Sequence, residues 1–447
     1  MTILVEPPRT ADPLDHPDAA TPAYAWYALF VLILAYILAF LDRQILNLLV
    51  QPIKRDLHLS DVQISLLQGL SFALFLSLGG LPIGRLIDTT RRTRLLGICI
   101  VVWSVASAGC GLARGYAQLL LCRIGVGVGE AAMTPSAYSL IGDYFGARRQ
   151  GVAMALYSVG AYLGSGLALL VGAEITARVP TGPVAVPLLG ALQGWQLVFV
   201  LIGLPGLVIA LWMITLREPR RTGTEPPALP LREVLAWFRG RAQPLILVNL
   251  AVAFVAIASN GMSAWLPTFF LRHFGMTTVE SGRTLGLIVI LVGGAATLSA
   301  GALGDWLRRR GHKDGRLRVM IAGIVLATPF AVATPLADTA SHAFLLLIPS
   351  YFFLVLAVGS GPATLQEVTP RRMRGMQHAF AVLAVNLLGL GLGPTIVALI
   401  TDHVLHDESK VGLSIAIAAP VALLVALILA LFARAPYTRA LAAHDVA

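Results

Sequence analysis

The stretch Gly84-Arg-Leu-Ile-Asp88-Thr-Thr-Arg91-Arg92 has a second copy in the chain, Gly301-Ala-Leu-Gly-Asp305-Trp-Leu-Arg308-Arg309. Glycine, leucine, aspartate and arginine recur in the two copies at one offset of 217 residues. A looser echo joins Arg149-Gln-Gly151 and Leu163-Gly-Ser-Gly166 to Arg374-Gly375 and Leu388-Gly-Leu-Gly391, at offsets of 224 to 225. The sequence therefore predicts two related halves.

Apolar segments surround both copies. Of the 447 residues 57% are apolar and only 13% charged, with a mean hydropathy of +0.79, which is typical of a chain that has lipid as its solvent. A hydrocarbon core about 30 Å thick needs roughly 20 apolar residues per helix. Twelve segments have about that length, near residues 25–50, 62–83, 95–113, 117–141, 150–173, 195–215, 244–270, 282–303, 317–336, 343–366, 376–400 and 411–433. The predicted fold class is all-α and integral to the membrane, with twelve transmembrane helices in two pseudo-symmetric six-helix bundles.

The distribution of Lys and Arg predicts the orientation, because these residues are retained on the cytoplasmic side. With both termini inside, 24 of the 33 basic residues lie in inside loops and tails and seven lie outside, while Arg43 and Arg123 fall within spans. We therefore expect a multi-pass protein of the cell's inner membrane with both termini cytoplasmic. The net charge of +10 is divided among short loops and does not form one basic face, which argues against nucleic acid as a partner.

The predicted spans divide the chain into five regions: a cytoplasmic tail at 1–22, a six-helix bundle at 23–216, a central cytoplasmic loop at 217–243, a second bundle at 244–436 and a tail at 437–447. The first tail has no basic segment followed by an apolar stretch, so we do not expect a signal peptide. Within the proline-rich central loop, Leu231 to Phe238 can form a short amphipathic helix on the membrane surface.

Asp42, Arg43, Arg123 and Glu130 are ionisable residues within predicted spans. Such a group costs several kcal/mol unless it is paired or faces water, and it often marks a substrate or proton path. A rise of 1.5 Å per residue places Asp42 and Arg123 in the outer half of the membrane, so that Asp42 or Arg43 can meet Arg123. Arg123 and Glu130 are two turns apart on one helix face. We interpret the four as proton-coupling and gating residues; the alternative is a static ion pair that joins two helices.

The repeated stretches supply a second candidate group, a cytoplasmic latch. Its residues are Asp88, Arg91, Arg92, Asp305, Arg308 and Arg309. Each aspartate is expected to pair with a basic group or a helix end across the two halves and to close the inside in one state. The alternative is that these charges only mark cytoplasmic loops.

Other polar residues in or at the ends of spans are weaker candidates for cargo contact: Gln68, Tyr157, Tyr162, Asn260, Gln366 and Asn386. Packing or hydrogen bonding between helices explains them equally well. The chain has no phosphate-binding loop of the Gly-x-x-x-x-Gly-Lys-Ser/Thr type, and no metal-ligand cluster or nucleophile motif stands out. We therefore expect no cofactor, no metal and no enzymatic activity.

Several motifs resemble the major facilitator superfamily and, within it, the Spinster family of lipid transporters. They are Phe40-Leu-Asp-Arg-Gln-Ile45, Gln51-Pro-Ile-Lys-Arg-Asp56, Arg123-Ile-Gly-Val-Gly-Val-Gly-Glu-Ala131 and Ser139-Leu-Ile-Gly-Asp-Tyr-Phe145. The pair Asp42-Arg43 with Arg123 and Glu130 is shared in part with organic-anion symporters of the superfamily.

The resemblance implies a cavity between two bundles, alternating access by rocking, and proton coupling through Asp42, Arg123 and Glu130. It also implies amphiphilic cargo such as lysophospholipids or sphingosine-phosphate-like lipids, and a monomer. A proton antiporter of hydrophobic drugs or small organic anions is the alternative on the same fold.

Overall fold

The computed structural model describes residues 22–180, 182–187, 190–220, 231–240, 242–370 and 373–445. The predicted tail at 1–22 lies outside these residues except for Pro22. The first half contains α1 (Pro22–Leu48), α2 (Val50–Leu57), α3 (Asp61–Ser65), η2 (Leu66–Leu70), α4 (Ser71–Thr89), α5 (Arg92–Cys110), α6 (Tyr116–Glu130), α7 (Met133–Tyr144), α8 (Ala147–Arg178), the antiparallel hairpin β1 (Val184–Val186) and β2 (Gly190–Leu192), and α9 (Gly194–Thr215).

The second half follows a short helix, α10 (Leu231–Gly240). It contains α11 (Ala242–Phe274), α12 (Thr278–Ile288), η3 (Val289–Gly293), α13 (Gly294–Arg309), α14 (Gly315–Ala333), η4 (Thr334–Leu336), α15 (Ala340–Glu367), α16 (Arg374–Ala384), η6 (Val385–Leu392), α17 (Gly393–Leu399), η7 (Ile400–Leu405), η8 (Glu408–Lys410) and α18 (Val411–Asp445). The short helix predicted in the central loop is therefore present as α10.

Eleven helical segments of the described chain are long and apolar enough to cross a membrane. The remaining predicted span, 117–141, is divided between α6 and α7, which are separated by Ala131 and Ala132. Pro135 accounts for the division, because in an unbroken helix it removes a hydrogen bond to residue 131 and its ring clashes with that carbonyl. In the first turn of α7 a proline costs little. The twelve-span prediction is confirmed, with a break that hydropathy alone does not predict.

Three spans contain π-helical turns that the apolar pattern does not predict. η2 joins α3 to α4 in the second span, η3 joins α12 to α13 in the eighth, and η6 lies in the eleventh. A π-turn adds a residue to one turn of the helix and is frequent at functional sites. The second and eighth spans are the pair that carries the repeated stretch, but η3 begins six residues beyond the place that the offset of 217 gives for η2, so the two interruptions are not at equivalent positions.

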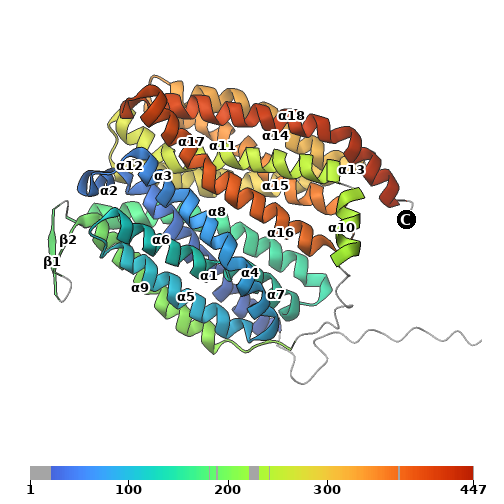
Figure 1. Cartoon of the computed structure of the whole chain (residues 1–447), viewed down its shortest axis with the longest axis horizontal. Coiled ribbons are helices and arrows are strands. Elements are labelled where there is room, and N and C mark those ends of the chain that lie inside the picture. Colours follow the sequence, from blue (N-terminus) through green and yellow to red (C-terminus); the bar gives the residue numbers. More distant parts are fainter. Residues whose placement is uncertain are drawn as a thin grey trace, which may run out of the picture.

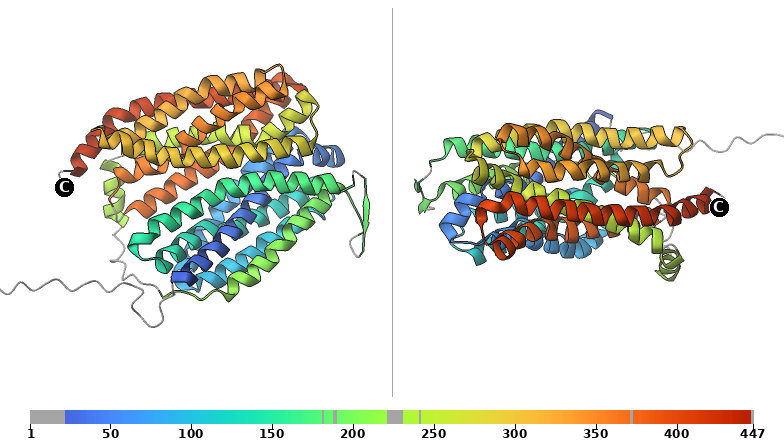
Figure 2. Two further views of the ribbon diagram at one scale, coloured as in Figure 1. Left: turned by 180° about the vertical axis from the view of Figure 1, so that it is seen from behind. Right: turned by 90° about the horizontal axis from the view of Figure 1, so that it is seen from above.

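The helices form two bundles that lie side by side (Figures 1 and 2). One end of the molecule, here called the terminal end, carries the start of α1 and the end of α18, and the opposite hairpin end carries β1 and β2 (Figure 1). Between the bundles, α8 packs on α12 and η3, while α4 and η2 pack on η6. The aromatic ring of Phe238 in α10 lies 5.5 Å from that of Phe380 in α16, so this helix rests on the second bundle.

Two glycine crossings bring the bundles into backbone contact. A Cβ atom on Gly69 would lie 2.3 Å from the carbonyl oxygen of Leu390, beside Gly391. A Cβ atom on Gly166 would lie 2.6 Å from the carbonyl oxygen of Gly286. Gly69 and Gly286 are 217 positions apart and Gly166 and Gly391 are 225 apart, which are the offsets of the sequence repeat. The two crossings are therefore related by the pseudo-symmetry, and both require the absence of a side chain.

Candidate functional site

Glu130 and Arg43 form a buried ion pair between α6 and α1. The Arg43 Nε atom donates to Glu130 Oε2 over 2.6 Å, and one terminal nitrogen of Arg43 contacts the same oxygen. The Glu130 side chain is inaccessible to solvent, whereas 24% of the Arg43 side chain is exposed. The Arg43 guanidinium lies 5.0 Å from the ring centroid of Phe40 and 4.7 Å from that of Phe72. Arg43 is thus the solvent-accessible member of the pair, and its guanidinium lies close to two aromatic rings.

The Asp42 side chain contacts α5, whereas that of the adjacent Arg43 contacts α6. The Oδ1 atom of Asp42 accepts a hydrogen bond of 2.5 Å from the Ser107 hydroxyl in α5, and the Asp42 side chain is buried. Arg123 reaches the backbone carbonyl of Asp42 over 3.3 Å, and its Nε atom donates to the Leu67 carbonyl over 3.2 Å. Asp42 and Arg123 are in contact, as the sequence predicts, but Arg123 binds the backbone carbonyl of Asp42 and not its carboxylate. It does not indicate that Arg43 is the partner of Glu130.

This charged group belongs to one bundle only. The residues at the offset of 224 from Arg123 and Glu130 are Leu347 and Leu354, both buried in α15. Where the second bundle has packed leucines, the first has an arginine and a glutamate. The duplication therefore conserves the scaffold, whereas the buried arginine and glutamate at these positions occur in the first half only.

Two of the weaker candidates contact residues of other helices. The Gln68 amide donates 3.1 Å to Asn47 Oδ1 and 3.2 Å to the carbonyl of Ala264 in the opposite bundle. The Tyr157 ring is buried and stacks on Tyr36 with centroids 4.4 Å apart. Gln68 therefore connects the bundles, and Tyr157 packs within the first bundle.

The other four weak candidates lie in or at the ends of other spans. The Tyr162 ring fills the space beside Gly293 of η3, which a Cβ atom would approach to 2.7 Å. The Asn260 amide donates to the Ala256 carbonyl one turn earlier, over 2.9 Å. Asn386 is half-buried in η6, and Gln366 is exposed near the end of α15. Their role in cargo contact stays a prediction.

At the terminal end of the first bundle, Arg92 of the predicted latch is buried. It pairs with Asp143 over 2.5 Å and with Glu218 over 2.7 Å. Burial opposes ionisation of Glu218, but hydrogen bonds from the Thr93 backbone N–H and from Arg92 hold the pKa of that carboxyl below its usual value.

The second bundle repeats this arrangement at an offset of 224. Arg316 and Glu367 take the places of Arg92 and Asp143, and they lie 3.3 Å apart. Asp305 and Arg308 of the latch join them: Asp305 accepts from Arg316 over 3.3 Å and Arg308 donates to Glu367 over 2.8 Å. Asp88, Arg91 and Arg309 are exposed. The latch across the halves stays a prediction for another state of the molecule, because the pairs of Arg92, Asp305 and Arg308 described here lie within one bundle.

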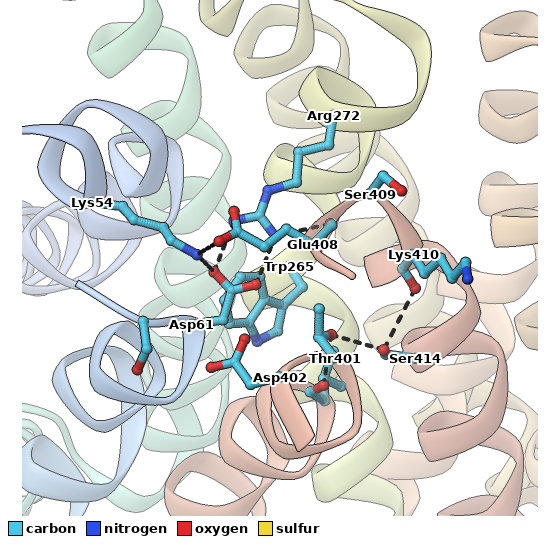
Figure 3. A network of polar contacts seen from close by, with 12 residues as sticks. Lys54, Asp61, Trp265, Arg272, Thr401, Asp402, Glu408, Ser409, Lys410 and Ser414 are labelled. Carbon is cyan, nitrogen blue, oxygen red and sulfur yellow. Dashed lines mark hydrogen bonds and ion pairs between the residues drawn. The ribbon is translucent and has the colours of Figure 1, made fainter. Parts of the chain in front are cut away.

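At the hairpin end lies a group of charges that sequence reasoning missed, here called the charged quartet: Lys54, Asp61, Arg272 and Glu408 (Figure 3). Asp61 accepts two hydrogen bonds from Arg272, over 2.6 and 2.8 Å, and one from Lys54 over 2.6 Å. Lys54 also pairs with Glu408 over 2.7 Å. In the sequence, Lys54 and Arg272 count only as loop charges. An aspartate at the start of an apolar span, Asp61, is the signal that could have indicated the group.

Comparison with known proteins shows which family has this architecture. The model of the Major Facilitator Superfamily matches residues 32–394. An MFS-type efflux pump of Mycolicibacterium smegmatis is 27% identical over 90% of each chain. Human protein spinster homolog 1 is 26% identical over 84% of this chain and 73% of its own length.

A solved structure gives the same result at the level of the fold. The crystal structure of a bacterial homolog of the human lysosomal transporter Spinster, inward-facing and unoccupied, has a TM-score of 0.76 at 26% identity. The match covers 94% of this chain and 98% of that one. The chain has two bundles with a duplicated scaffold and charges inside the spans. Together with these relatives, this architecture indicates a secondary transporter and not an enzyme. The chain belongs to the major facilitator superfamily, and within it resembles the Spinster transporters.

Proposed function

We propose that the protein is a proton-coupled carrier of amphiphilic lipids with an anionic headgroup, such as lysophospholipids or sphingosine-phosphate-like lipids, and that it works as a monomer by alternating access. Because the loops and tails assigned to the side of the termini contain 24 of the 33 Lys and Arg residues of the sequence, we place the terminal end toward the cytoplasm of a cell with this protein in its inner membrane. The observation that carries the proposal is the pair of buried Glu130 and partly exposed Arg43.

The pair links an anion to a proton. An anionic headgroup that reaches the exposed atoms of Arg43 competes with Glu130 for the same guanidinium. A carboxylate buried without a partner is costly in free energy. Glu130 therefore takes up a proton when the Arg43 guanidinium leaves it to bind the headgroup of the cargo. Loss of the cargo reverses both steps. Symport and antiport are both compatible with this linkage.

Asp42 and Arg123 form the second element of the proposed coupling. The Oδ2 atom of Asp42 and one terminal nitrogen of Arg123 are buried without a hydrogen-bond partner among the described residues. A buried polar group left unsatisfied carries a free-energy cost. A small rearrangement between α1, α5 and α6 that pairs these two groups is therefore favourable, and it offers a second protonation-dependent contact beside Glu130.

The aromatic rings favour amphiphilic cargo. Phe40 and Phe72 flank the cation, and Tyr36 contacts Phe40 with centroids 5.0 Å apart. Phe72 is fully buried, but Phe40 and Tyr36 are partly exposed, and an apolar chain can lie against these two rings while the headgroup meets Arg43. Efflux of hydrophobic drugs or small organic anions is the second candidate, and the similarity to an efflux pump favours it.

The test is uptake of a fluorescent lysophospholipid into proteoliposomes with and without a pH gradient. We expect Glu130→Gln and Asp42→Asn to bind the lipid but to lose the response to the gradient. Glu174→Gln is the matched control, because Glu174 pairs at the exposed surface of the hairpin end and should respond like the wild type. If both core variants also respond like the wild type, these carboxylates are structural and the coupling proposal is wrong.

Competition separates the two cargo classes. An excess of unlabelled lysophospholipid should suppress uptake, whereas a hydrophobic drug without an anionic group and a small organic acid without a chain should not. Suppression by the drug or the acid alone would favour the second candidate.

A further inference from the structure

The charged quartet joins the two bundles crosswise (Figure 3). Lys54 in α2 and Asp61 in α3 belong to the first bundle, while Arg272 in α11 and Glu408 in η8 belong to the second. Asp61 with Arg272 and Lys54 with Glu408 are the pairs that cross between the bundles. Each bundle contributes one cation and one anion, so neither carries a net charge from this group when the two separate.

Three of the four side chains are shielded from water, which makes their pairing stronger than a surface contact, whereas Glu408 is 57% exposed and adds a weaker contact at the edge. The Asp61 side chain is 0% exposed, that of Arg272 is 9% and that of Lys54 is 11%. Two hydrogen bonds in parallel fix the planar guanidinium against the Asp61 carboxylate. The ring of Trp265 lies under Arg272, 5.9 Å from its guanidinium carbon, and donates to the Pro394 carbonyl over 2.9 Å.

Further hydrogen bonds cross the interface beside the quartet. The Val62 backbone N–H donates to Asp402 over 2.9 Å, and the hydroxyl groups of Ser65 and Thr395 lie 3.5 Å apart. Deeper in the molecule, Gln68 reaches the Ala264 carbonyl. All three contacts join the second span of the first bundle to the second bundle.

An exposed ion pair crosses between the bundles at the same end. Arg283 of α12 pairs with Glu174 of α8, with exposed side-chain fractions of 54% and 39%. Exposed pairs contribute little, because water and salt screen them. The hairpin end thus offers a buried and an exposed contact across one interface.

We propose that the charged quartet is the lock that holds the hairpin end closed, and that the bundles open at this end only when Arg272 leaves Asp61. Removing one partner leaves the other charge buried and uncompensated in the closed state, which therefore loses stability relative to the open one. The exposed pair of Glu174 and Arg283 does not have this role. The inference requires neither the proposed cargo nor proton coupling.

Two single-cysteine reporters in nanodiscs test the lock, in a background with Cys99, Cys110 and Cys122 replaced by alanine. Ser65→Cys lies at the closed interface, and Asn386→Cys lies in η6, half-buried on the side of the terminal end. Both are labelled with a water-soluble maleimide without cargo. Arg272→Gln and Asp61→Asn should each raise the labelling rate of Ser65→Cys roughly tenfold or more and lower that of Asn386→Cys.

The controls make the outcome decisive. Glu174→Gln should change the labelling rates by no more than about threefold. The double variant Asp61→Asn/Arg272→Gln should label no faster than the faster single variant, because both remove the same contact. An unchanged or slower rate at Ser65→Cys would overturn the proposal. A rise at both reporters would overturn it too, since the quartet would then maintain the fold and not the closed end.

Discussion

The two ends of the molecule use charge differently. At the hairpin end Asp61 and Arg272 pair between bundles, whereas at the terminal end Arg92 with Asp143 and Arg316 with Glu367 pair within them. The pairs within the bundles recur at an offset of 224, but the quartet arises only where the two halves meet. This cluster within the bundles is thus duplicated with them, whereas the quartet is not. The pairs of Asp314 with Arg318 and Arg434 in the second bundle have no such counterpart, because Thr90 stands at the offset of 224 from Asp314.

The largest effect is expected from breaking a charge cluster within one bundle. The Arg92 side chain is 2% exposed and holds two carboxylates, whereas that of Arg316 is 26% exposed. Arg92→Met should cost about 3–5 kcal/mol, because two half-buried carboxylates lose the buried cation between them. Arg316→Met should cost about 1 kcal/mol, as is usual for a partly solvated pair.

Thermal unfolding in detergent measures both, with the wild type as the reference. Equal losses in the two variants would contradict the claim that burial makes the first cluster the stronger. The comparison is controlled, because the two arginines hold the same place in the duplicated scaffold.

A smaller effect is expected where the bundles cross. Gly69→Ala places a Cβ atom against the Leu390 carbonyl and should cost about 1–3 kcal/mol through overpacking. Gly80→Ala in the same span meets nothing within 4 Å and should be neutral or stabilise by up to about 1 kcal/mol. Melting temperature and transport rate are the measurements. A neutral Gly69→Ala variant would show that the crossing is not tight in solution.

The smallest effect is a dependence on pH at the terminal end. Because folding lowers the pKa of Glu218, its contribution to stability is present in full above the ordinary glutamate value of about 4.3 and is lost as the pH falls through the lowered value. The difference in melting temperature between the wild type and Glu218→Gln should therefore stay nearly constant from pH 7 to about pH 5 and shrink as the pH falls below about 4. A difference that grows on acidification would have the wrong sign for this account.

Hydropathy and the repeated stretches were enough to predict the spans, because lipid forces nearly every residue of a span to be apolar and helical. They did not predict the break at Ala131 and Ala132 or the π-turns, which depend on one proline and on contacts between spans. In the site, spacing placed Arg123 and Glu130 on one face. Their partners lie on other helices, so the pairing of Arg43 with Glu130 follows only from the packed structure.

The charged quartet shows the same limit more sharply. Asp61 and Arg272 are 211 positions apart, and although Asp61 stands out at the start of an apolar span, Arg272 looks like an ordinary loop charge in the sequence. Nothing local indicates that one will neutralise the other. A contact between two bundles is set by how whole helices pack, and local patterns in the sequence do not reveal that packing.

The glycine crossings also divide each of these spans into a short segment toward the hairpin end and a long segment toward the terminal end. Gly69 lies eight residues from the start of its span at Asp61 and 20 from its end at Thr89, and Gly286 lies eight from Thr278 and 23 from Arg309. At 1.5 Å per residue the lever arms are roughly 12 Å toward the hairpin end and 30–35 Å toward the terminal end. A rotation about these fulcra moves the terminal end about two and a half times as far as the hairpin end. A movement just large enough to break one ion pair on the short arm therefore becomes, on the long arm, a displacement comparable to the width of a lipid.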